Sequence, residues 1–312
     1  MKPPIRTIFI GTPAFSVPAL EALLSDHDFN VVAVISQPDR PIGRKQEVTP
    51  TPVKQSALLA GVPVLQPEKI REIIPQISEL KPEIIIVVAY AQIIPEELLR
   101  LPKFGCINIH ASLLPKYRGA SVLQAPILNG DKESGVTIMK MDKTLDTGPI
   151  INQAKINLEP DETPSTLAKK LSDLGASILT TTLKKFISGE FKAVPQNNSF
   201  SSYVKMLTKD DGRIDWNDSA ENIERKVRAM MPWPGAWTTW DGQTLKITAV
   251  NKEIRRIEQY RPGEAFSDHG KLAIQCGIDA LVVERLQLEG KSVMGSEEFL
   301  RGNAKILHQI LT

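Results

Sequence analysis

The stretch EIIIVVAYAQIIPEELLRLPKFGCINIH, residues 83–110, decides the fold class that we predict for this chain. Two short and predominantly apolar runs, 83–90 and 105–110, flank an amphipathic piece over 94–101. Continuously apolar runs are typical of parallel strands buried on both faces, whereas half-exposed strands alternate apolar and polar residues. The stretch therefore predicts a strand–helix–strand unit of an α/β protein.

The same alternation extends to both sides of this stretch, over about the first 190 residues. The expected strands are 6–12, 30–36, 133–142 and 148–158, and the expected helices are 16–26, 51–61, 68–80 and 163–190. This order predicts a doubly wound, mostly parallel, Rossmann-like sheet with helices on both faces.

The pattern of the chain changes after the last of these helices. Residues 191–207 are polar, contain a proline and show no regular period, so we predict a linker there. Beyond them we expect a helix over 219–230, with Ser219 as its N-cap, and a hairpin that turns at Asp241-Gly242. We therefore predict an α/β domain over 1–190 and a small β-barrel domain over 208–312.

Composition narrows the class of protein. The 312 residues carry a net charge of +2, with 42% hydrophobic and 24% charged residues, which is typical of a globular chain and too balanced to indicate a nucleic-acid binder by itself. The longest apolar run is too short to span a membrane, and the N-terminus does not have the pattern of a signal peptide. Cys106 and Cys276 lie far apart in apolar runs, so we predict buried thiols, no metal site and a cytoplasmic location.

Asn108 and His110 end the second apolar run of the opening stretch. Side chains alternate along a strand, so these two point to the same side. The carboxyl ends of parallel strands are where open α/β sheets bind ligands. An amide can stabilise an oxyanion and an imidazole can take up and return a proton, so the pair predicts acyl transfer to an amine. No activated Ser or Cys is evident, so a covalent acyl-enzyme is not required.

A histidine in this role needs a carboxylate to orient it. Asp146, in MDKTLDTGP over 141–149, lies on a loop between two expected strands, and Gly148 permits a sharp turn there. Asp142 is the alternative, and the sequence favours Asp146 only slightly.

GCINIHASLLPKYRG, residues 105–119, followed by MDKTLDTGP resembles the 10-formyltetrahydrofolate-dependent formyltransferases. The resemblance implies a catalytic triad of Asn108, His110 and Asp146. It also implies that the folate donor contacts a turn made of Ser112, Leu113, Leu114 and Pro115. A pterin pocket that uses the loop 90–94 and the backbone of 141–144 is implied as well.

Five further segments resemble the members of this family that act on initiator methionyl-tRNA: 11–24, 36–44, 51–54, 213–216 and 232–237. The resemblance implies direct transfer of the formyl group of 10-formyltetrahydrofolate to the amino group of methionine on that tRNA, for translation initiation. It also implies that the second domain is an OB-like barrel that binds tRNA. Nothing in the sequence indicates a membrane partner or an obligate protein partner.

Several basic residues are candidates for contact with tRNA. Arg40, Arg44 and Lys45 lie in the long, proline-containing loop 37–52, and loops of this length inside a compact domain are usually functional. Glu47 makes this loop less basic than is usual in the family. Lys116, Tyr117 and Arg118 follow the folate turn and either face tRNA or cap the turn. We expect the tryptophans of the second domain to pack in its core rather than to stack on bases: Trp216, Trp233, Trp237 and Trp240.

Three alternatives stay open at this point. A formyltransferase acting on a small amine, such as an amino-sugar nucleotide or glycinamide ribonucleotide, would share the triad without needing the loop 37–52. A 10-formyltetrahydrofolate hydrolase would use water as the acceptor. A non-catalytic RNA-binding protein on the same fold would not need the intact Asn108, His110 and Asp146.

Overall fold

The computed structural model describes residues 3–42, 46–251, 254–256 and 259–312. The chain packs into two compact units. The first contains residues 1–122, 133–157 and 168–204, and the second contains 123–132, 158–167 and 205–312. Two segments from the predicted α/β domain, 123–132 and 158–167, thus contribute to the second unit, and the predicted boundaries at 190 and 207 stay predictions.

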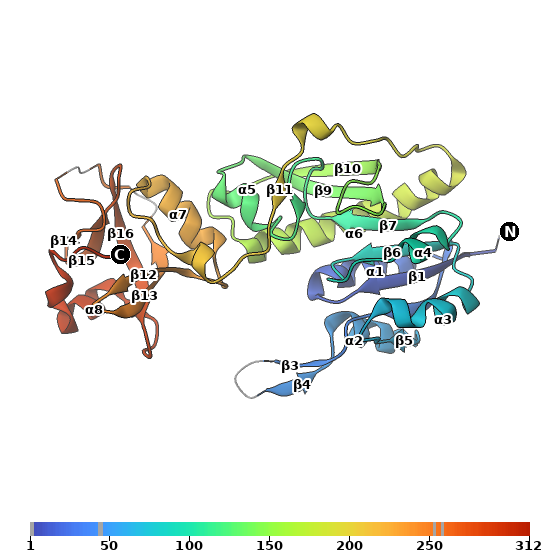
Figure 1. Ribbon diagram of the computed structural model, residues 1–312, viewed down its shortest axis with the longest axis horizontal. Helices are drawn as coiled ribbons and strands as arrows, with labels where there is room; N and C mark the ends of the chain where they lie inside the picture. The colour runs from blue at the N-terminus through green and yellow to red at the C-terminus, as the bar shows by residue number, and fades with distance from the viewer. Residues whose placement is uncertain (1–2, 43–45, 252–253, 257–258) are drawn as a thin grey trace. The chain divides into compact units, whose positions relative to one another are not determined.

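Within the described residues, the first unit is built on a seven-stranded sheet (Figure 1). In spatial order its strands are β10 (Ile150–Asn157), β9 (Glu133–Lys140), β7 (Cys106–His110), β6 (Ile84–Val88), β1 (Ile5–Gly11), β2 (Phe29–Ile35) and β5 (Val64–Leu65). The five strands from β5 to β7 are parallel, whereas β9 and β10 pair antiparallel. The predicted parallel-rich α/β fold is confirmed, with an antiparallel edge that the sequence pattern did not distinguish.

The chain reverses its direction across the sheet between β1 and β6. From β1 it moves outward to β2 and β5, and it then returns to β6 on the other side of β1. The carboxyl ends of the strands at such a switch point form the usual ligand crevice of an open α/β sheet. Asn108 and His110 lie at the carboxyl end of the neighbouring strand, β7.

Helices cover this sheet on both faces. The helices of this unit are α1 (Val17–Ser25), α2 (Pro52–Leu59), α3 (Ile74–Glu79), α4 (Glu96–Arg100) and most of α6 (Pro164–Ser188), and short 3-10 turns occupy Ala14–Ser16, Ile70–Ile73 and Asn198–Phe200. The short helix α5 (Gln124–Leu128) belongs to the second unit. Ile74 and Leu98, from α3 and α4, share a buried cluster with Ile85 and Cys106 on one face. Gly175 of α6 lies against Ile109 on the other face.

The helix expected over 68–80 is shorter than predicted. The structure has a 3-10 turn over Ile70–Ile73, followed by α3. Pro75 sits in the first turn of α3, where its missing N–H costs nothing. A continuous helix would place Pro75 in the helix interior, where its ring clashes with the preceding turn.

The predicted loop 37–52 contains a hairpin. β3 (Arg40–Ile42) and β4 (Glu47–Thr49) pair antiparallel, with Arg40 opposite Thr49. The sequence indicated a long, proline-containing loop and did not indicate these strands, because prolines mask short edge strands in a sequence pattern.

Within the described residues, the second unit carries a six-stranded antiparallel sheet. Its strands are β12 (Ala236–Trp240), β13 (Gln243–Val250), β16 (Ala280–Leu288), β15 (Lys271–Gln275) and β14 (Ala265–Asp268), with β17 (Met294–Gly295) on β16. Its helices α7 (Ala220–Ala229) and α8 (Ser296–Gly302) precede and follow these strands, and a 3-10 turn spans Ala304–Ile306. The antiparallel β domain is confirmed. No pairing joins β12 to β14 in the described part of the chain, so the closed barrel stays a prediction.

Two local features that the sequence predicts in the second unit are present in the structure: the N-cap of α7 and the turn between β12 and β13. The Ser219 hydroxyl caps α7 by accepting a hydrogen bond from Asn222 N at 3.2 Å. Asp241 and Gly242, with φ of 50° and 73°, turn the chain between β12 and β13, as an Asp-Gly hairpin requires.

Both cysteines are buried, whereas the tryptophans differ in their exposure. Cys106 and Cys276 are buried as predicted, and burial raises the pKa of each thiol to about 12. Trp216 and Trp240 are in the core, whereas the side chain of Trp233 is 57% exposed. The expectation of core packing is therefore wrong for Trp233.

Candidate active site

Asn108 and His110 lie on the same side of β7, at its carboxyl end. The strand is held on one side by parallel β6, with Asn108 next to Val87, and on the other side by antiparallel β9, with His110 next to Thr137. The apolar residues of β7 are buried in the sheet, so its register is fixed and its two polar side chains emerge together.

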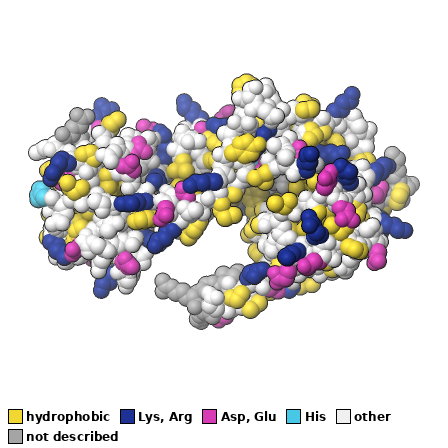
Figure 2. Space-filling view, in the orientation of Figure 1, with side chains coloured by type: hydrophobic (Ala, Val, Ile, Leu, Met, Phe, Trp, Pro, Cys, Tyr) yellow, Lys and Arg dark blue, Asp and Glu magenta, His cyan; other side chains and the backbone are white. Residues whose placement is uncertain are grey.

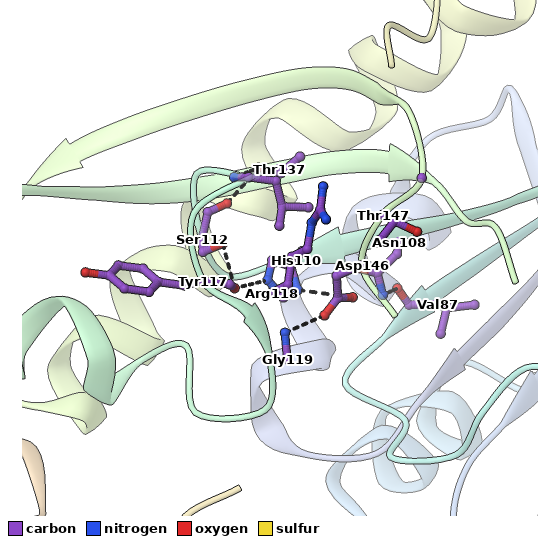
Figure 3. A network of polar contacts seen from close by, with 12 residues as sticks. Val87, Asn108, His110, Ser112, Tyr117, Arg118, Gly119, Thr137, Asp146 and Thr147 are labelled. Atoms are coloured by element: carbon purple, nitrogen blue, oxygen red, sulfur yellow. Dashed lines mark hydrogen bonds and ion pairs between the residues drawn. The ribbon is translucent and has the colours of Figure 1, made fainter. Parts of the chain in front are cut away.

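His110 is 7% exposed and is held between two oxygens (Figure 3). Its Nε2 lies 2.9 Å from the carbonyl oxygen of Tyr117, and its Nδ1 lies 3.6 Å from Oδ1 of Asp146. A carbonyl oxygen only accepts hydrogen bonds, so Nε2 carries a proton and donates it. Nδ1 is then the nitrogen that can take up a further proton, next to a carboxylate that stabilises the resulting positive charge.

Asp146, rather than Asp142, is the carboxylate beside His110. Its Oδ2 accepts a hydrogen bond from Gly119 N at 2.8 Å, and its backbone is left-handed with φ of 55°. Asp142 is exposed and holds its own loop, accepting from Thr144 N at 3.0 Å and from Thr147 Oγ1 at 2.8 Å. The structure thus selects Asp146, which the sequence favoured only slightly over Asp142.

The loop that carries Asp146 needs a glycine at the position that the sequence indicated. A Cβ at Gly148 would collide with the carbonyl oxygen of Lys140. Gly148 therefore permits a close approach of two backbones, which brings the loop onto the end of β9.

Asn108 contributes an amide to the same place. Its Nδ2 donates to the carbonyl oxygen of Val87 at 3.2 Å, and an amide nitrogen carries a second hydrogen. Its Oδ1 is buried and has no hydrogen-bond partner among the described residues. Buried polar atoms without partners are uncommon, and they are expected where a ligand completes the site.

Several hydrogen bonds hold the turn that is predicted to contact folate. Ser112 Oγ donates to the carbonyl oxygen of Lys116 at 2.7 Å, and Leu114 N donates to Thr137 Oγ1 at 3.0 Å. Gln153 Nε2 donates to the carbonyl oxygen of Leu114 at 2.8 Å. Ser112 and Leu114 are buried within the turn, whereas Leu113 and Pro115 are half-buried. The predicted contact with folate stays a prediction for all four residues.

The segment after β6 has an unusual backbone. Ala89 and Ala91, on either side of Tyr90, have positive φ of 46° and 65°, a conformation that costs free energy for residues other than glycine. The Tyr90 hydroxyl is buried without a partner among the described residues, and burial raises the pKa of Tyr90 to about 12. This segment begins at the switch point of the sheet, where such strain is typical of a binding site.

The basic residues predicted to face tRNA differ in their surroundings. Arg40 is exposed and its guanidinium lies 3.0 Å from a carboxylate oxygen of Glu68. Arg44 and Lys45 lie outside the described residues. Lys116 is exposed, with its ammonium over the ring of Tyr117. Arg118 is 2% exposed, so its side chain has almost no surface for a contact with tRNA, and the alternative that it caps the turn stays a prediction.

The sequence did not indicate two of the groups that surround the triad. The carbonyl oxygen of Tyr117 carries no side-chain signal. Gln196, from the predicted linker, donates to the carbonyl oxygens of Asp146 at 2.9 Å and Gly148 at 2.8 Å. Contacts this distant in sequence, from a segment without periodicity, leave no pattern to detect.

Two family models match this chain. A family model described as formyl transferase matches residues 5–183, and a model described as formyl transferase, C-terminal domain, matches residues 206–304. The chain belongs to the formyl transferase family. It is therefore a formyltransferase, and the resemblance seen in the sequence is confirmed.

Relatives within this family are similar over almost the whole chain. A methionyl-tRNA formyltransferase from Caldanaerobacter subterraneus is 43% identical over 96% of this chain and 97% of the relative. One from Geobacter metallireducens is 44% identical over 96% of both chains.

Solved structures share the fold of this formyltransferase. The crystal structure of an N-formyltransferase from Helicobacter canadensis, in complex with folinic acid and dTDP-3-aminofucose, superposes with a TM-score of 0.67 at 24% identity. The superposition covers 89% of this chain and 99% of the Helicobacter canadensis chain.

In the described part of the present chain, no helix is long and apolar enough to cross a membrane, and no three potential metal ligands cluster together.

Proposed function

We propose that this formyltransferase transfers the formyl group of 10-formyltetrahydrofolate to the α-amino group of methionine on initiator methionyl-tRNA. The observation that carries the proposal is the similarity, over 96% of the chain, to relatives named methionyl-tRNA formyltransferase. The site supports the proposal as well, because it places an amide donor, a histidine and a carboxylate at one edge of the sheet. We place the reaction in the cytoplasm.

Three side chains and one backbone carbonyl have separate roles in the proposed reaction. The bound donor supplies an activated formyl carbon. The amide of Asn108 donates a hydrogen bond to the oxygen that becomes negative as the amine attacks. Nδ1 of His110 takes the proton of the amine and returns it to the leaving nitrogen, while the Tyr117 carbonyl keeps Nε2 protonated. Asp146 stabilises the positive ring during this interval.

The residues at this edge fit a polar, ring-containing donor. Asn108 Oδ1 and Tyr90 Oη are both buried and without partners among the described residues, so each can bond to a polar ligand atom. The turn 112–115 adds two half-buried apolar side chains, Leu113 and Pro115, on a fixed backbone. Pockets for organic co-substrates usually combine an apolar lining with a few polar atoms of this kind.

A formylation assay with labelled 10-formyltetrahydrofolate tests the proposed function directly. Four reactions with the full chain are compared: initiator methionyl-tRNA, an amino-sugar nucleotide, glycinamide ribonucleotide and no added acceptor. We expect label to appear on the tRNA alone. Label on a small amine, release of formate without an acceptor, or tRNA binding without transfer would each support one of the alternatives and overturn the proposal.

The choice of carboxylate gives a prediction with a matched control. We expect Asp146→Asn to lower kcat for formyl transfer by at least about tenfold, because a neutral amide no longer stabilises the positive His110 ring. Asp142→Asn makes the same chemical change on the same loop, away from His110, so we expect a smaller loss. Steady-state measurement of kcat in the two variants tests this prediction. A larger loss of kcat in Asp142→Asn than in Asp146→Asn would contradict the choice of Asp146 as the carboxylate that acts on His110.

Recognition of tRNA is expected to depend on a few basic side chains at defined positions, and not on the net charge of the chain. The net charge is only +2, and on the face shown in Figure 2 the Lys and Arg side chains are interspersed with Asp and Glu. Global attraction between the chain and RNA is therefore weak. We propose that the 37–52 segment supplies contacts through Arg40, Arg44 and Lys45.

Arg44 is the position at which we test this proposal. We expect Arg44→Ala to raise KM for tRNA while KM for the folate donor stays unchanged, because the loss removes a phosphate contact and leaves the folate turn intact. The slope of tRNA affinity against salt is expected to decrease by about one phosphate contact. Unchanged tRNA kinetics, or equal loss for both substrates, would contradict a role in tRNA binding.

A further inference from the structure

The segment after α6 returns across the first unit instead of leaving it (Figure 1). We call residues 194–204 the strap. At one end of the strap, Val194 and Ile150 exchange backbone hydrogen bonds of 2.8 Å. At its other end, β11 (Tyr203–Val204) pairs in parallel with β8 (Arg118–Gly119). The strap therefore lies against both the loop that carries Asp146 and the turn that follows His110.

Gln196 links these two parts of the site through its side-chain amide. Its Nε2 donates to the carbonyl oxygens of Asp146 at 2.9 Å and Gly148 at 2.8 Å. Its Oε1 accepts from Nε of Arg118 at 3.1 Å and from Nη2 of Arg118 at 2.7 Å. Both donor hydrogens and both lone pairs of the amide are used, so the orientation of the group is fixed by its partners.

The strap reaches the carboxylate of Asp146 by a second route. Pairing with β11 fixes β8, since Arg118 N donates to the carbonyl oxygen of Ser202 at 2.8 Å. The next residue, Gly119, then directs its N–H to Oδ2 of Asp146 at 2.8 Å. Asp146 is thus held at its main chain by Gln196 and at its side chain by Gly119, in a left-handed conformation that is costly for aspartate.

The buried guanidinium of Arg118 anchors the strap. Besides Gln196, it donates to Asn198 Oδ1 at 2.8 Å and to Tyr203 Oη at 3.0 Å. A charge that is 2% exposed requires such partners, because an unpaired buried charge is strongly unfavourable. A connection that served only to join two units would not need to pack a buried arginine against a candidate active site.

We propose that Gln196 is a positioning residue for formyl transfer, which holds the carboxylate of Asp146 beside Nδ1 of His110. The inference rests on the proposed function, because it assumes that His110 and Asp146 carry the reaction. Removing the two amide hydrogen bonds releases the main chain of Asp146, and a small displacement of a catalytic group costs rate without weakening substrate binding.

The full-length chain offers three variants that separate the contacts of Gln196. Gln196→Ala removes all of them. Gln196→Glu keeps the bond to Arg118 and cannot donate to the two carbonyl oxygens, so the strap stays anchored while the loop is released. Asn198→Ala removes another partner of Arg118, on the same strap, and leaves the Asp146 loop untouched.

We expect Gln196→Ala and Gln196→Glu to lower kcat by about 10- to 100-fold, with KM for tRNA and donor unchanged. Asn198→Ala is expected to keep the kcat of the unmodified chain. Wild-type kcat in Gln196→Glu, or an equal loss in Asn198→Ala, would overturn the inference, since either result would show that anchoring of the strap rather than the hold on Asp146 matters.

A double-variant cycle with Asp146→Asn separates positioning from general structural damage. If Gln196 acts through the carboxylate, Gln196→Ala adds less than about a twofold loss once that carboxylate is gone. A full additional loss would overturn the inference. The proposed function fails separately: normal kcat in both His110→Ala and Asp146→Asn would remove the reaction assignment, whereas slow Asp146→Asn with normal Gln196→Ala removes only the positioning role.

Discussion

Replacing His110 with alanine is expected to lower kcat for formyl transfer by about 10²–10⁴, the range for loss of a group that moves a proton in the transition state. The attacking amine must lose a proton and the leaving nitrogen must gain one. In the structure only His110 among the three candidate catalytic residues has a nitrogen suited to both steps, and that nitrogen faces Asp146 at 3.6 Å. In His110→Ala, solvent water would have to move the proton, and it would be less well oriented toward the reacting nitrogens.

The measurement is a comparison of kcat and donor affinity in the same preparation. Donor binding is expected to change little, because hydrogen bonds with Thr137 and Gln153 hold the folate turn at Leu114. His27→Ala is the matched control, since His27 is an exposed histidine of the first unit and should leave kcat unchanged. A near-normal kcat in His110→Ala would rule out the proposed proton transfer.

Much of the framework around this histidine follows from local sequence signals. The apolar runs that became β6 and β7 are buried on both faces, so nothing competes with their strand pattern. Alternation along β7 then places Asn108 and His110 on one side. These inferences succeed because strand burial and side-chain alternation depend on neighbours in the chain.

Other features depend on contacts between distant segments and therefore escape a sequence pattern. Asp146 and Asp142 share a loop, and only the left-handed turn at Asp146, with the close approach at Gly148, decides which carboxylate meets His110. Arg118 lies two residues after the exposed Lys116, yet partners about 80 residues away bury it. The strap has the polar, irregular composition of a linker, and its structural role comes from contacts with residues that are distant in sequence.

The second large effect is expected at Asn108. Asn108→Ala should lower kcat by about 10²–10³, the usual result of removing one donor to a developing oxyanion. KM for tRNA is expected to stay unchanged, because the interaction forms only as the formyl oxygen becomes negative. Asn108→Asp is a sharper variant, since it keeps the shape of the side chain but puts a negative charge where the oxyanion develops. We expect it to be at least as slow as the alanine variant.

Stability measurements separate this catalytic role from a structural one. Asn108 donates one hydrogen bond, to Val87, and its Oδ1 is buried without a partner among the described residues. Loss of a hydrogen bond costs about 0.5–1.5 kcal/mol, and removal of a buried, unpaired acceptor returns a similar amount. The free energy of unfolding should therefore change little in Asn108→Ala while kcat decreases by orders of magnitude. A large loss of stability with normal kcat would show that Asn108 supports the sheet and does not take part in the reaction.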